Sequence, residues 1–101
     1  MIKNIYLVRD LVSHVDSELS IAPSDSAAER SFGLQLESSG VDKRLASDLM
    51  LVQVGTIDYG SGLAYPTISG HPTPYPVCSG RDALEYVSHY NERMADDESH
   101  V

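Results

Sequence analysis

The sequence predicts an α+β fold, in which a small antiparallel sheet of three or four strands (β-β-α-β-β) is followed by a C-terminal helix. The main observation is a long run of strand-favouring residues at 49–57, which is apolar on both alternating faces and ends at a glycine-rich turn. Segments whose apolar residues have helical spacing lie on either side of this run in the sequence. A chain of 101 residues forms one domain, which we expect to span residues 1–95, with an acidic disordered tail at 96–101.

The N-terminal half is expected to supply two strands and one helix. Residues 2–9 favour a first strand, and residues 19–22 favour a second strand that pairs with it as an antiparallel hairpin. Ser26 and Glu29 have the spacing of a capping box, which predicts a helix from Ser26 to about Ser38. Three apolar residues at helical spacing form its predicted buried stripe: Ala28, Phe32 and Leu36.

The central strand is expected to form a hairpin with residues 63–65, and Pro66 ends that pairing. Gly60 and Gly62 supply the positive φ that a short hairpin loop needs. Regular alternation places five residues on one face of this strand: Leu49, Leu51, Gln53, Gly55 and Ile57. We expect the first helix to cover this face, with the Phe32 ring packed at Gly55, where a missing side chain leaves room.

The opposite face of the central strand, with Met50, Val52 and Val54, is expected to lie against the C-terminal helix or a partner subunit. If that helix leaves the face open, the pattern points to a homodimer that buries the face between subunits. The C-terminal helix should begin after Ser79 and carry an apolar stripe: Ala83, Tyr86, Val87, Tyr90 and Met94.

A proline-rich segment at 67–78 should be extended and largely free of ladder hydrogen bonds. Two interpretations stay open, a strap across its own domain, which we favour, and a ligand for an aromatic groove of a partner protein. The candidate partner-binding residues are Pro72, Pro74, Tyr75 and Pro76.

The chain is strongly acidic, with 15 acidic and 7 basic residues and a formal net charge of −8. Because nonspecific affinity for nucleic acid comes mainly from Lys and Arg contacts to phosphates, this balance argues against a general DNA coat. A local face for single-stranded DNA stays open, since Lys3 and Arg9 share one side of the first strand and three tyrosines offer stacking surfaces, Tyr6, Tyr59 and Tyr65. The candidate nucleic-acid-binding residues are Lys3, Tyr6, Arg9, Lys43 and Arg44. Ordinary solvated surface is the interpretation we favour.

Nothing in the sequence predicts an enzyme, a metal site or a cofactor. The four histidines form no pair with ligand spacing, and the glycines fit no nucleotide-binding motif. Cys78 is the only cysteine, and we expect a buried or half-buried structural thiol rather than a nucleophile paired with His71 or His89. No apolar run approaches the ~20 residues of a membrane span, so we expect a soluble, cytoplasmic protein.

The order of these elements resembles the small nonstructural protein of gokushovirus-type microviruses, which are icosahedral phages with circular single-stranded DNA. Residues 30–32 (Arg-Ser-Phe) match the core of that family's helix, residues 54–58 (Val-Gly-Thr-Ile-Asp) its strand, and residues 61–62 (Ser-Gly) its turn. The resemblance covers about residues 3–66. Arg9, Ile57 and Ser47 depart from the family's usual Tyr, Phe and Glu.

The resemblance implies a non-virion protein made in the host bacterial cytoplasm and linked to genome synthesis or packaging. It carries over no catalytic residues. Two functions stay open. The first is an accessory factor that binds a viral or host replication or packaging protein, and the second is a direct binder of single-stranded DNA. A third idea, that the acidic surface mimics DNA to block a host nuclease, is weaker.

Overall fold

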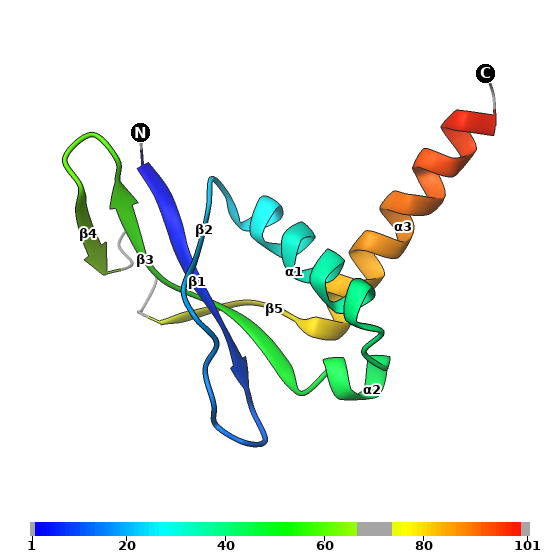
Figure 1. Cartoon of the computed structure of the whole chain (residues 1–101), viewed down its shortest axis with the longest axis horizontal. Coiled ribbons are helices and arrows are strands. Elements are labelled where there is room, and N and C mark those ends of the chain that lie inside the picture. Colours follow the sequence, from blue (N-terminus) through cyan, green and yellow to red (C-terminus); the bar gives the residue numbers. More distant parts are fainter. Residues whose placement is uncertain (1, 67–73, 100–101) are drawn as a thin grey trace.

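Five strands form one antiparallel sheet in the computed structural model, with β3 at its centre (Figure 1). The strand β1 pairs with one edge of β3 along its whole length, while β4 and β5 share the other edge and β2 pairs with β1. The structure describes residues 2–66 and 74–99, and the side chains of residues 2–64 and 74–89. The elements in chain order are β1 (Ile2–Asp10), β2 (Ser20–Ala22), α1 (Asp25–Ser39), α2 (Lys43–Ala46), β3 (Leu49–Asp58), β4 (Leu63–Pro66), β5 (Tyr75–Ser79) and α3 (Gly80–Ser99).

The predicted α+β class is confirmed, with one strand more than expected. The added strand is β5, so the prediction that residues up to 78 lack ladder hydrogen bonds was wrong for this part of the segment. Tyr75 and Pro76 lie opposite Gln53 and Val52 in an antiparallel register. A proline is tolerated here because β5 is an edge strand, in which one row of N–H groups needs no partner.

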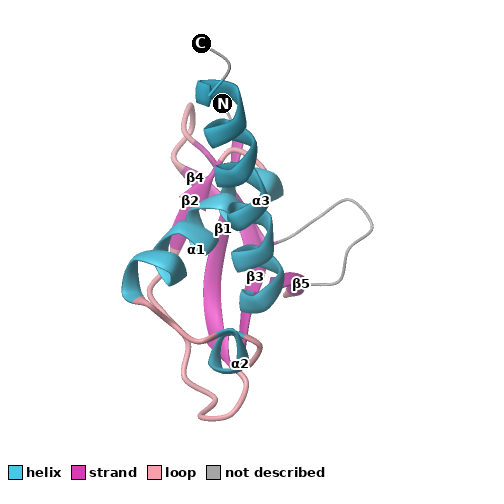
Figure 2. Ribbon diagram, turned by 90° about the vertical axis from the view of Figure 1, so that its right-hand side faces the viewer, coloured by secondary structure: helices cyan, strands magenta, loops and turns pink. Residues whose placement is uncertain are grey.

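All three helices lie on the same side of the sheet (Figure 2). The buried cluster joins Tyr6 and Leu51 of the sheet to Phe32 of α1, Ala46 of α2 and Ala83 of α3. Of the two alternatives for the opposite face of β3, cover by the C-terminal helix was therefore wrong, and cover by a partner subunit stays a prediction. The last turns of α3 instead project beyond the sheet (Figure 1).

A β-bulge in β3 changes which residues share a face. Tyr6 lies opposite Gln53 and Ile5 lies opposite Gly55, so Val54 is an extra residue with no partner on β1. Because neighbouring residues of β1 point to opposite faces, Gly55 lies on the side away from the helices, whereas Leu51 lies beneath them. Regular alternation therefore fails after Gln53.

The buried stripe of α1 is confirmed, since Ala28, Phe32 and Leu36 are each at most 6% exposed. Phe32 lies beside Leu51 and Val8, with which it lines a small hollow. The predicted contact between Phe32 and Gly55 was wrong, because the bulge turns Gly55 to the other face.

Close packing of α1 on α3 depends on a glycine. A Cβ atom at Gly33 would overlap the Ala83 carbonyl oxygen and a Val87 methyl group, so the helices approach to backbone contact at this point. Gly80 allows a similar approach at the start of α3, where a Cβ would overlap the Ala46 carbonyl oxygen. Glycine inside a helix lowers stability by about 1 kcal/mol relative to alanine, but at Gly33 it permits the close approach of α1 and α3.

The helix ends differ in detail from the predictions. Ser24, rather than Ser26, caps α1 and accepts a hydrogen bond from the Ala27 amide at 3.2 Å. In α3, Leu84 is buried while Tyr86 is 41% exposed, and the side chains at 90 and 94 lie outside the described residues. The helix continues to Ser99, so residues 96–99 of the expected tail are helical.

The hairpin turn between β3 and β4 has a positive φ at Gly62 (73°), as expected, but not at Gly60. No helix among the described residues combines the length and hydrophobicity needed to cross a bilayer.

Candidate functional site

The side of the sheet away from the helices forms a broad apolar surface, which we call the open sheet face. Along β1 it takes the odd-numbered residues, because the even-numbered Tyr6 and Val8 point toward the helices. The pairing of β1 with β2 and β3, and of β3 with β5, extends the face across the sheet. Its members are Lys3, Ile5, Leu7, Arg9, Ile21, Met50, Val52, Ile57 and Pro76.

Most of the apolar side chains on this face stay partly accessible. Ile5, Leu7, Met50 and Ile57 are half-buried, and Ile21 is 45% exposed. They lie next to one another on neighbouring strands, and within the described part of the chain no helix covers them (Figure 2). A contiguous exposed apolar patch of this kind is typical of an interaction surface.

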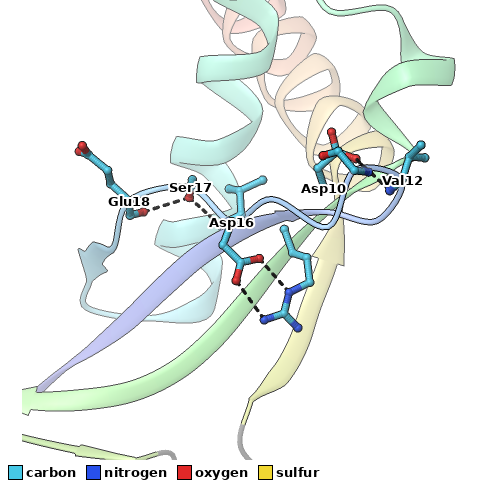
Figure 3. Close-up of polar contacts among 8 residues, drawn as sticks. Asp10, Val12, Asp16, Ser17 and Glu18 are labelled. Atoms are coloured by element: carbon cyan, nitrogen blue, oxygen red, sulfur yellow. Dashed lines mark hydrogen bonds and ion pairs between the residues drawn. The ribbon is translucent and has the colours of Figure 1, made fainter.

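The open sheet face carries little charge. None of its members is an acid, and its two bases lie near its ends. The Lys3 ammonium lies over the Tyr59 ring, 5.1 Å from the centroid, in a cation–π contact. Arg9 donates from Nε to Asp16 at 2.9 Å, and this hydrogen bond lowers the pKa of the Asp16 carboxyl (Figure 3). The Arg9–Asp16 pair is neutral, so the face differs sharply from the acidic chain around it.

The structure separates the candidate nucleic-acid-binding residues. Lys3 and Arg9 share one face of β1, as predicted. Tyr6 points to the other face and is fully buried, so the expectation that its ring stacks on a base was wrong. Lys43 and Arg44 belong to α2, on the helix side of the sheet.

The candidate partner-binding prolines are also divided. Pro72 lies outside the described residues, Pro74 is exposed, and Pro76 is an exposed residue of β5. Tyr75 is anchored to its own domain, because its hydroxyl donates to Asp25 Oδ2 at 2.6 Å. For Tyr75 this arrangement supports the interpretation as an internal strap.

A polar network on the helix side joins three elements around Asp25. The Tyr6 hydroxyl donates to Asp25 Oδ1 at 2.6 Å, Tyr75 donates to the other carboxylate oxygen, and Asn4 donates to the Tyr6 hydroxyl at 2.9 Å. Burial, together with the Asp25 hydrogen bond, raises the pKa of Tyr6. The network connects β1 and β5 to the start of α1, and no sequence motif predicted it.

Cys78 is half-buried on the helix side, opposite Leu51. Burial, reinforced by the nearby Glu29, Asp82 and Asp25 carboxylates, raises the pKa of the thiol to about 12. The thiol therefore stays protonated at neutral pH, whereas a nucleophilic cysteine needs a lowered pKa. Of the histidines considered as its partner, His71 lies outside the described residues and His89 is exposed on α3.

Acidic residues do not gather into a metal centre in the part of the chain that the structure describes, where no group of three or more His, Cys, Asp or Glu side chains is arranged to hold a metal ion. No protein-family model, curated protein or solved structure matches the chain. The open sheet face is the surface with the clearest capacity for binding.

Proposed function

We propose that this chain is a non-catalytic accessory protein of a small single-stranded-DNA phage, which acts in genome synthesis or packaging by binding other proteins in the host cytoplasm. The resemblance of residues 3–66 to gokushovirus-type nonstructural proteins suggests the phage context. The observation that carries the binding role is the open sheet face, an apolar and nearly neutral surface on a chain of net charge −8.

The chemistry of this face favours a protein as its ligand. The cores of protein interfaces are depleted of charged residues and rich in apolar ones. Ile5, Leu7, Met50 and Ile57 supply such a core, and Lys3 and Arg9 lie toward its rim. A nucleic acid would instead need several unpaired cations.

The first partner we propose is a second copy of this chain. Two acidic chains repel each other over most of their surfaces, but two open sheet faces meet without opposing acids. Two sheets packed face to face, about 10 Å apart, form a common and stable arrangement. A two-fold axis between the sheets would bury the half-buried side chains of Leu7 and Met50 of both copies at the centre.

Direct binding of single-stranded DNA is the second candidate, and the Lys3–Tyr59 contact favours it by combining a cation with an exposed ring. A fluorescence anisotropy titration with labelled oligo(dT) across a salt series separates the two functions. We expect no binding at about 150 mM salt.

Affinity that falls linearly with salt on a log–log plot would overturn the protein-binding proposal in favour of the DNA binder. In that case the slope should decrease by about one unit in Lys3→Gln, since one phosphate contact is lost. The matched control is Lys43→Gln, which removes one base from α2 on the helix side. An equal loss in both variants would indicate nonspecific attraction.

A further inference from the structure

Three adjoining hollows follow the seam between α1, the β1–β2 connection and α2. Their volumes are about 620, 390 and 230 Å³. The largest shares Leu49 with the second hollow and both Phe32 and Val8 with the third, so the three adjoin one another, and together we call them the seam groove. This seam groove lies on the helix side of the sheet and shares Ile21 with the open sheet face.

The seam groove is apolar at its base and acidic along its sides. Phe32 and Leu36 lie at its base, where they are buried. Three charged residues line the hollows: Asp10, Glu18 and Asp48. All three are acids, and no Lys, Arg or His is among the described residues that line the groove.

Apolar side chains also stand exposed around the groove. Val12 is 70% exposed, and Leu19 and Leu45 are each 64% exposed, although all three line the hollows. They come from different segments, the β1–β2 connection and α2. Such a concentration of exposed apolar residues on a small domain is typical of a surface that binds a partner.

Hydrogen bonds hold the β1–β2 connection in place (Figure 3). The Asp10 carboxylate accepts from the amides of Val12 at 2.9 Å and Ser13 at 3.1 Å. Ser17 Oγ accepts from the Val8 amide at 2.8 Å and donates to the Glu18 carbonyl at 2.9 Å. Val12 is therefore presented by an ordered turn, which lowers the ordering cost of binding.

We propose that the seam groove binds an amphipathic segment of another protein, with apolar side chains along one side and Lys or Arg residues beside them. The apolar side chains would lie on Phe32 and Leu36, and the bases would face Glu18 and Asp48. Nucleic acid is disfavoured by the acidic lining. The adjacent bases of this chain, Lys43 and Arg44, lie on α2, and α2 is also the helix that supplies Leu45 to the groove. A second copy of this chain would have to present as its ligand the same helix that lines its own groove, so it is a poorer occupant.

The test uses a labelled synthetic helical peptide of Leu and Lys as the probe and a Leu/Glu peptide of the same pattern as its charge-reversed control. Fluorescence anisotropy with the full chain should show binding of the Lys peptide, weakening with salt, and no binding of the Glu peptide. The double variant Glu18→Lys/Asp48→Lys and the double variant Val12→Ser/Leu19→Ser should each weaken binding at least about tenfold.

Glu85→Lys is the matched control, because Glu85 lies on α3 in an exposed pair with Arg81, away from the groove residues. It changes the net charge as each single groove substitution does, and it should leave affinity within about twofold. The single variant Glu18→Lys is measured beside it, and equal weakening by these two charge-matched variants would show general attraction to an acidic protein and overturn the proposal. Unchanged binding in both groove variants would also overturn it. Circular dichroism verifies that each variant is folded.

Discussion

Phe32→Ala is expected to lower the free energy of unfolding by about 3–5 kcal/mol, as is typical when a buried aromatic ring is truncated. Phe32 is 4% exposed and is the only phenylalanine in the chain. It belongs to the cluster that joins α1 to Tyr6 and Leu51 of the sheet, so the substitution leaves a cavity between the two layers. A loss of this size approaches the whole stability of a small domain.

Urea denaturation monitored by circular dichroism measures this effect. The matched control is Leu34→Ala on the same helix, since Leu34 is 41% exposed and lies off the buried stripe. It should cost no more than about 1 kcal/mol. Equal losses in the two variants would contradict the orientation of α1 described above.

Gly33→Val should destabilise the chain by about 3 kcal/mol, at the upper end of the range for overpacking. The new side chain would overlap the Ala83 carbonyl oxygen, which is backbone and unable to rotate away, and also a methyl group of Val87. The helix α3 must then move away from α1. The higher helix propensity of valine offsets only a few tenths of a kcal/mol.

Ser31→Val is the control for Gly33→Val, because Ser31 is an exposed residue of α1. Its effect should stay within about 0.5 kcal/mol. Thermal denaturation of both variants provides the comparison. If Gly33→Val melts like the wild type, α3 does not pack on α1 at this glycine.

Local patterns predicted four of the strands and the helices α1 and α3, because the formation of an element depends largely on neighbouring residues, but they missed α2 and β5. The spacing of Ala28, Phe32 and Leu36 identified the buried side of α1, and Gly62 marked the hairpin turn. The faces of β3 were predicted only as far as Gln53. A glycine within a strand is compatible with either a bulge or a close contact, and the sequence around Gly55 does not distinguish them.

Local sequence patterns did not predict where α3 packs. A central strand with two apolar faces predicts that helices pack on both sides of the sheet, yet α3 packs beside α1 on the same side. The reason lies in small residues far apart in the sequence, Gly33 and Ala83 at one contact and Ala46 and Gly80 at another. Only the tertiary structure shows that they meet.

The candidate site was partly predictable. The even spacing of Lys3 and Arg9 correctly placed them on one face of β1, and the same rule assigns Tyr6 to the other face. The pairing of Arg9 with Asp16 depends on the path of the β1–β2 connection, which the sequence does not specify. The open sheet face itself follows from the position of α3.

Sedimentation equilibrium over about 1–100 μM chain concentration tests the proposed interface most directly, with Leu7→Lys as the disrupting variant. The proposal predicts that the wild-type chain has twice the monomer mass at the upper concentrations. Leu7→Lys should remain monomeric, because it places a charge at the centre of the open sheet face, while the control Leu34→Lys on α1 should dimerise like the wild type. A wild-type chain that is monomeric throughout this range, or a Leu7→Lys variant that dimerises equally well, would contradict an interface between two copies at this face.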